Sequence, residues 1–284
     1  MNRLLLQNAL SVMDFMITAL SKAFLTKNGG HDMQTLADIV TENLRAIGLP
    51  QHPIYEEILS HAVTSAPPPF AENWFGRRYF ELAKKAEWFA NSLVANAALE
   101  GYGATQIWKF SNKVDNESYA SAVRKHALDE SRHSTIFIVM LKLVFPGAHI
   151  DTATARTIDE LQPHYSPKSH PPIEKSPDGE LYRGERLLHE LIQVHITEIR
   201  ALVLQHLLRP TLLAYSPSSS RQRLDALSRS LIRDESRHIE YTAEIFEAAA
   251  ANGSKDFIFE SFESCLRQFN DLTMIELERE NVTI

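Results

Sequence analysis

The five-residue sequence DESRH occurs twice in this chain, at residues 129–133 and again at residues 234–238. In each copy a glutamate stands three residues before a histidine, so that Glu130 precedes His133 and Glu235 precedes His238. Residues three apart lie on the same face of an α-helix, and such a pair can reach one metal ion. Each copy therefore predicts half of a metal site, carried by one helix.

A helical bundle that holds two metal ions needs two further carboxylates, one from each of two additional helices. In a helical hairpin, residues at equal distances from the turn lie at the same level. If the first turn lies near residues 113–116, Glu130 follows it by 14 residues and Glu100 precedes it by 13. Glu81 and Glu87 lie two or more helical turns too far away. The spacing therefore selects Glu100 as the partner of Glu130.

A second hairpin repeats this arrangement. A turn near residues 216–219 places position 200 opposite Glu235, and Glu198 is the nearest carboxylate. Glu100 and Glu198 both lie in apolar helical stripes, where an ionised carboxylate is costly unless a cation neutralises it. We therefore expect six ligands to a pair of metal ions: Glu100, Glu130, His133, Glu198, Glu235 and His238.

The apolar periodicity predicts an all-α chain without a long strand. The fold class that we expect is a ferritin-like four-helix bundle with one long crossover and extra N- and C-terminal helices. We expect residues 1–69 to form a helical cap of three short helices, and residues 70–284 to form the bundle with its C-terminal helix, in one compact domain. The expected long helices are 70–112, 116–145, 180–215, 219–251 and 255–280, and the crossover 146–179 contains a short helix near 157–161. The apolar stretch 4–25 predicts an amphipathic helix rather than a signal peptide, because polar residues interrupt it.

The six residues resemble the ligand set of the ferritin-like di-iron carboxylate oxygenases and oxidases. The Asp-Glu-x-Arg-His form of both copies is similar to that of the bacterial multicomponent monooxygenases, and the size of the chain is similar to that of the arylamine N-oxygenases. The resemblance covers roughly residues 75–250. It implies that Asp129 and Asp234 hold ligand histidines by hydrogen bonds, and that Arg132 and Arg237 balance buried negative charge.

Two positions depart from members of this family. Phe137 stands where the ribonucleotide reductase small subunit has a radical tyrosine, so radical storage is disfavoured. Leu231 stands where the arylamine N-oxygenases have an additional histidine ligand. His126, four residues before Glu130, and His195, three before Glu198, are the alternatives for an extra ligand.

Carboxylates with two imidazoles suit iron or manganese, and both two irons and a mixed manganese–iron pair are open. The expected function is activation of O2 by a non-haem di-iron oxygenase or oxidase that oxidises a small organic substrate, by N-oxygenation of an amine or hydroxylation of a C–H bond. We expect the substrate to enter beside Ala97, Gly101 and Ala104. The chain carries no Gly-rich nucleotide motif, so an external ferredoxin or flavin reductase would supply electrons. The alternatives are a ferritin-type ferroxidase or iron-handling protein, and a metal-free helical scaffold.

Composition narrows the class of partners. The formal net charge of −7 argues against nucleic acid as a partner. The single cysteine, Cys265, excludes an intramolecular disulfide and fits a reducing cytoplasm. No uncharged apolar run approaches the length of a membrane span, so we expect a cytoplasmic protein with no membrane contact, and a homodimer is compatible with the sequence.

Overall fold

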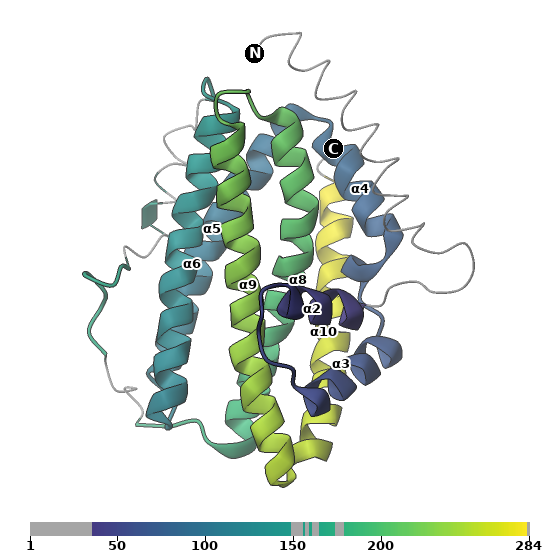
Figure 1. The fold of residues 1–284 in the computed structure, drawn as a ribbon, viewed down its shortest axis with the longest axis vertical. Helices are drawn as coiled ribbons and strands as arrows, with labels where there is room; N and C mark the ends of the chain where they lie inside the picture. Colours follow the sequence, from purple (N-terminus) through teal and green to yellow (C-terminus); the bar gives the residue numbers. More distant parts are fainter. Residues whose placement is uncertain (1–35, 149–155, 157–158, 161–164, 174–178, 283–284) are drawn as a thin grey trace. The chain divides into compact units, whose positions relative to one another are not determined.

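The computed structural model describes residues 36–148, 156, 159–160, 165–173 and 179–282, and this part of the chain is α-helical (Figure 1). Two isolated bridges, Val114 with Tyr182 and Ser166 with Ser169, are the β-type pairings found within it. Two short elements, η1 (Pro69–Ala71) and the π-helical turn η2 (Ala250–Ser254), accompany the α-helices. The α-helices are α2 (Leu36–Ala46), α3 (Pro53–Ser65), α4 (Asn73–Ala83), α5 (Ala86–Ser111), α6 (Glu117–Val144), α8 (Gly184–Tyr215), α9 (Arg221–Ala249) and α10 (Lys255–Val282).

The expected all-α class agrees with these elements, and α6, α8, α9 and α10 lie within a few residues of their expected bounds. Asn252 and Gly253 break the helical backbone between α9 and α10, as expected, and Gly253 adopts a φ of +100° that favours glycine. The expected helix over residues 4–25 lies outside the described residues, as does most of the one near 157–161.

The expectation of one continuous helix over residues 70–112 is wrong. The helix is interrupted at Lys84 and Lys85, between α4 and α5. The Tyr215 hydroxyl lies 2.8 Å from the carbonyl oxygen of Ala83 and 3.0 Å from that of Lys84. A carbonyl at the end of a helix needs a donor, and this phenol provides one. The carbonyls exposed by the interruption are therefore satisfied by a residue about 130 positions away in the sequence.

The chain divides into two units. The first comprises the described residues of Phe80–Arg183 and Leu208–Leu231, and the second comprises those of Met16–Tyr79, Gly184–Leu207 and Ile232–Ile284. The expected boundary at residue 69, between a cap and a bundle, does not coincide with the division into these two units and stays a prediction. Helices α8 and α9 each contribute residues to both units.

In the first unit, α5 and α6 form a hairpin around a short turn. Asn116 caps α6 by accepting a hydrogen bond from the backbone N–H of Tyr119 at 3.1 Å. Farther along, the Ser134 hydroxyl donates to the carbonyl of Ala97 at 2.6 Å and joins the two helices at mid-length. This register fixes which residues of α5 face the DESRH copy on α6.

In the second unit, α3 is tied to α9 and α10. Pro53 occupies the first turn of α3, and the carboxylate of Glu247 on α9 accepts the backbone N–H of Tyr55 at 2.8 Å. At the other end of α3, Asn270 on α10 donates to the carbonyl of Ala66 at 3.1 Å. These two contacts hold α3 against α9, which carries the second DESRH copy, and against α10.

Candidate metal centre

The first unit brings together Glu100, Glu130 and His133, which we name the first half-site. The Nδ1 atom of His133 lies 3.3 Å from a carboxylate oxygen of Glu130 and 3.9 Å from one of Glu100. One ligand atom from each of the three residues lies within 4.8 Å of the others. The structure thus places Glu100, on α5, at the level that the hairpin spacing requires.

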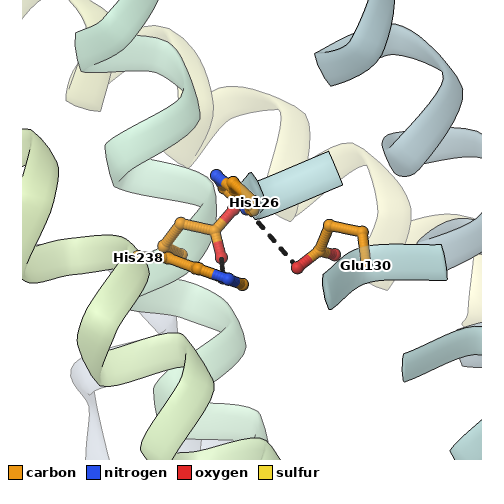
Figure 2. A group of neighbouring side chains, drawn as sticks. His126, Glu130 and His238 are labelled. Carbon is orange, nitrogen blue, oxygen red and sulfur yellow. Dashed lines mark hydrogen bonds and ion pairs between the residues drawn. The ribbon is translucent and has the colours of Figure 1, made fainter. Parts of the chain in front are cut away.

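His126 lies beside Glu130 of the first half-site. It stands one turn before Glu130 on α6, is 1% exposed, and places its Nε2 atom 3.4 Å from a carboxylate oxygen of Glu130 (Figure 2). Glu130 therefore has an imidazole on each side along its own helix, because His133 follows it by three residues. His126 is positioned to act as an additional donor.

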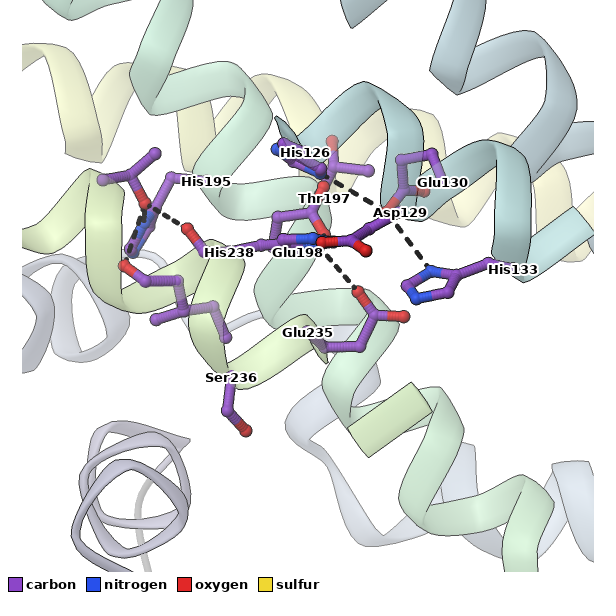
Figure 3. Close-up of polar contacts among 12 residues, drawn as sticks. His126, Asp129, Glu130, His133, His195, Thr197, Glu198, Glu235, Ser236 and His238 are labelled. Carbon is purple, nitrogen blue, oxygen red and sulfur yellow. Dashed lines mark hydrogen bonds and ion pairs between the residues drawn. The ribbon is translucent and has the colours of Figure 1, made fainter. Parts of the chain in front are cut away.

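The second unit brings together Glu198 on α8 with Glu235 and His238 on α9, which we name the second half-site. The Nδ1 atom of His238 lies 3.3 Å from a carboxylate oxygen of Glu198 and 3.5 Å from one of Glu235 (Figure 3). All three side chains are at most 5% exposed. Each unit therefore contains two carboxylates around the Nδ1 atom of one histidine.

These distances fit donors that surround one cation. Bonds of about 2.1 Å to nitrogen and oxygen place neighbouring donors roughly 3.0–3.4 Å apart at octahedral or tetrahedral angles. Three of the four carboxylate-to-imidazole distances lie between 3.3 and 3.5 Å, and the fourth is 3.9 Å. Small side-chain adjustments would bring both half-sites to such a geometry. The first half-site, whose three residues place ligand atoms within 4.8 Å of one another, therefore fits a metal ion. In the second half-site, Glu198 and Glu235 each approach the Nδ1 atom of His238 closely enough to share a cation with it.

The pKa of the Glu130 carboxyl in the first half-site is lowered by its neighbours. Burial by itself raises the pKa of the Glu130 carboxyl, but the hydrogen bond from Glu100, the charge of His133 and the hydrogen bonds from His126 and His133 outweigh it. The pKa of Glu130 is consequently held well below its usual range. Glu130 is thus ionised at neutral pH, which is the form that binds a cation.

His195, one of the two alternatives for an extra ligand, is differently engaged. Its Nε2 atom lies 2.8 Å from the hydroxyl of Tyr55, and its Nδ1 atom lies 2.6 Å from the hydroxyl of Thr242. The Thr242 hydroxyl has one proton, which it donates to the carbonyls of His238 and Ile239, at 2.9 Å each. It therefore accepts from Nδ1–H of His195, and Nε2 of His195 accepts from Tyr55.

Both ring nitrogens of His195 are thus committed to hydroxyl groups, and the geometry does not favour it as a ligand. The side chain is fully buried, and this burial lowers the pKa of His195 to about 3, although the charge of Glu198 acts in the opposite direction. His195 is therefore a neutral imidazole. Burial likewise raises the pKa of Tyr55 well above its usual value.

Tyr55 and Thr242 were not found by sequence reasoning. Tyr55 lies 140 residues before His195 in the chain, and no spacing rule connects them. Thr242 follows His238 by four residues, so its position one turn along the same helix was a usable signal. Together the two hydroxyls fix the orientation of the His195 ring, which lies one helical turn before Glu198.

The Asp and Arg residues of the two copies pair with each other. Arg132 lies 2.8 Å from Asp129, and Arg237 lies 3.6 Å from Asp234. The arginine side chains are 42% and 55% exposed, so their charges lie at the protein surface. The expectation that the aspartates hold ligand histidines stays a prediction.

The side of α5 where we expected a substrate is closely packed. Ala97 and Ala104 are fully buried, and Gly101 is buried as well. The carbonyl of Ala97 already accepts a hydrogen bond from the Ser134 hydroxyl on α6. Entry along this side would therefore require α5 and α6 to separate.

Comparisons of the chain with models of protein families, with curated proteins and with solved structures found no match. Among the described helices, none combines the length and the apolar character that crossing a membrane requires.

Proposed function

We propose that the two half-sites together form the centre of a ferritin-like non-haem di-iron oxygenase or oxidase. In this proposal α5, α6, α8 and α9 are the four helices of the bundle, and the segment between α6 and α8 is its crossover. The observation that carries the proposal is the duplication of the donor set. The same three donors, two carboxylates and the Nδ1 atom of a histidine, occur in each unit on two helices.

Charge supports a pair of divalent cations. Four buried or nearly buried glutamates would carry four negative charges, which two ferrous ions would neutralise. Carboxylate-rich sites with imidazoles favour iron or manganese over softer metals.

Bound iron would supply redox chemistry toward dioxygen, and the residues would determine where that chemistry occurs. Glu100 is the most exposed of the six predicted ligands, at 13%, whereas the other five side chains are at most 8% exposed. We therefore propose that the organic substrate approaches at the Glu100 carboxylate itself, and that the packed side of α5 at Ala97 and Ala104 is not its path. The three side chains of the second half-site are at most 5% exposed, which would limit the access of water to it.

The overall reaction requires an external reductant. Insertion of one oxygen atom into a C–H or N–H bond converts the other atom to water and consumes two electrons and two protons. An external ferredoxin or flavin reductase would deliver the electrons. The substrate class that we propose is a small organic molecule with an oxidisable amine or C–H group.

Iron binding is the first test. Ferrous iron is added to the metal-free protein without oxygen, excess iron is removed, and the metal is counted by mass spectrometry. We expect about two irons per chain. Glu235→Gln should lose iron, whereas the matched variant Glu244→Gln, an exposed position on the same helix α9, should retain it. Equal iron contents in the two variants would refute the proposed ligands.

A turnover experiment separates an oxygenase from an iron-handling protein. The iron-loaded protein receives labelled O2, a chemical reductant and a panel of small amines, and products are examined by mass spectrometry. Incorporation of one labelled atom into an organic product supports the proposal. Continued oxidation of excess ferrous iron to a mineral, without a labelled organic product, would favour a ferroxidase instead.

A further inference from the structure

Helix α9 carries a row of exposed arginines along one side. Arg229, Arg233 and Arg237 are spaced four residues apart, and all three side chains are exposed. Residues at this spacing follow one another along the same face of a helix. We name these three residues the arginine row.

The row differs from the rest of the chain in the sign of its charge. From Arg221 to Arg237, every exposed charged residue of α9 is an arginine, and the acids of this stretch, Asp225, Asp234 and Glu235, are partly or fully buried. The first exposed acid that follows on α9 is Glu244. Because the whole chain has a net charge of −7, this local excess of positive charge does not follow from its composition.

Some of this charge is balanced by neighbouring acids. Arg229 lies 2.8 Å from Asp225, which also accepts from Arg209 at 2.6 Å. Arg237 lies 3.6 Å from Asp234. Two arginines thus share Asp225, and a net positive charge is left at the exposed surface. Asp225 is 21% exposed and Arg229 is 60% exposed, so the arginine is the group that solvent meets.

The row lies across α9 from the second half-site. At 3.6 residues per turn, Arg233 points about 170° away from the midpoint between Glu235 and His238. A partner bound on the row would be separated from the half-site by about one helix diameter, 10–12 Å with side chains. No other element needs to lie between them, because the residues belong to one helix.

We propose that the arginine row is the docking surface for an acidic one-electron carrier protein of the ferredoxin class. This inference rests on the proposed function, because a redox centre without a nucleotide-binding motif needs such a donor. Charge complementarity selects the partner, since an acidic carrier would be attracted to the row and repelled by the acidic remainder of the chain. The short path through α9 would connect the carrier to the predicted ligands.

The test measures binding of the full chain to an acidic plant-type [2Fe–2S] ferredoxin by calorimetry at low ionic strength. We expect binding that weakens as salt is added, because surface charges are screened over about 10 Å at 0.1 M salt. The double variant Arg229→Glu/Arg233→Glu should bind roughly tenfold or more weakly than the unaltered chain. Arg229→Gln/Arg233→Gln, which removes the charge without reversing it, should show a smaller loss.

The control is Arg77→Glu/Arg267→Glu, which changes the net charge by the same amount at two exposed positions outside α9. It should bind the ferredoxin within about twofold of the unaltered chain if the row forms the contact. Circular dichroism and thermal unfolding establish that each variant is folded. Equal losses in the row variant and the control would overturn the proposal, as would failure of the unaltered chain to bind the ferredoxin at low salt.

Two further probes distinguish other partners. Binding of duplex DNA, or of vesicles rich in anionic lipid, that is stronger than ferredoxin binding and is lost in the row variant would overturn the assignment to a carrier protein. All binding measurements use metal-free protein, so they do not depend on iron loading. If the iron-binding test finds no iron in the unaltered chain but the ferredoxin still binds the arginine row, the proposed function is refuted and the docking surface remains supported.

Discussion

The two DESRH copies have the same sequence but different surroundings. In the first copy the Asp129 side chain is 26% exposed and Glu130 is 8% exposed, whereas in the second copy Asp234 is 7% exposed and Glu235 is 1% exposed. The Glu-to-His distances are nevertheless similar, 3.3 Å and 3.5 Å. The motif thus determines the local geometry, and the remainder of the fold determines access and solvation.

The neighbours of the two copies account for this difference. Glu130 has His126 beside it on its own helix, so the first half-site contains a nearby spare donor. The second half-site is accompanied by His195, which is held between Tyr55 and Thr242. We expect the first half-site to tolerate the loss of one ligand, and the side chains around the second half-site to be rigid.

The largest difference between the two half-sites should be in iron affinity, when one carboxylate is removed from each in turn. We expect Glu235→Gln to reduce iron affinity by roughly 100-fold or more, since loss of a direct ligand should exceed the 10- to 100-fold effect of losing an outer hydrogen-bond partner. Glu130→Gln should cost less, because His126 can supply a donor. Anaerobic titration with ferrous iron measures both affinities. If the two variants are equally impaired, the spare-donor argument is wrong, and adding His126→Ala to Glu130→Gln should then have no further effect.

Removal of the Tyr55 hydroxyl should destabilise the second half-site. Tyr55→Phe leaves Nε2 of the fully buried His195 without its donor, which should lower the free energy of unfolding by about 2 kcal/mol. Chemical denaturation measures the change. Tyr102→Phe, at a side chain that is 53% exposed, is the matched control and should change stability by less than about 0.5 kcal/mol. Equal effects at the two positions would show that the Tyr55 hydrogen bond does not contribute.

Acid should lower the free energy of unfolding of the chain through His195. The pKa of His195 is about 3 in the folded chain, below the value of about 6.5 for an unfolded histidine. Only the unfolded state gains this proton as the pH falls from about 6.5 toward 3, so the stability that is present above pH 6.5 is progressively lost. From pH 6.5 to 5.5 this group should cost about 1 kcal/mol. His195→Gln should unfold with a correspondingly smaller pH dependence, and an unchanged dependence would contradict the neutral assignment.

The two motif arginines should contribute least to stability. Arg132→Ala and Arg237→Ala remove exposed ion pairs, which typically contribute less than about 1 kcal/mol. We expect each variant to unfold within about 0.5 kcal/mol of the unaltered chain. A loss several times larger in either variant would indicate that the arginine balances buried charge, as the family resemblance implies. Thermal and denaturant unfolding of the two variants compare the copies directly.

Sequence spacing located the half-site residues because short turns leave little freedom. The hairpin of α5 and α6 turns within a few residues, so counting from the turn identified Glu100. The same counting pointed to position 200 and so to Glu198, the nearest carboxylate. Helical periodicity and turn length are local properties, and a single sequence reports them well.

Other features depend on contacts that the sequence does not encode locally. The carbonyls at the interruption between α4 and α5 accept from the Tyr215 hydroxyl, and His195 accepts from Tyr55 of α3. Neither phenol is connected to its partner by a helical spacing. By contrast, the arginine row was readable from the four-residue spacing on α9, but its significance depends on the burial of the acids between its members.

The amide proton of Tyr55 reports on the attachment of α3 to α9 and to His195. This N–H donates to the Glu247 carboxylate at 2.8 Å, and the side chain of the same residue contacts His195. Any motion that detaches α3 would break both hydrogen bonds at once. The rate at which this one amide exchanges with deuterium would therefore report how often α3 detaches from Glu247 and His195, and a bound ligand that slows this detachment would be detected without any turnover.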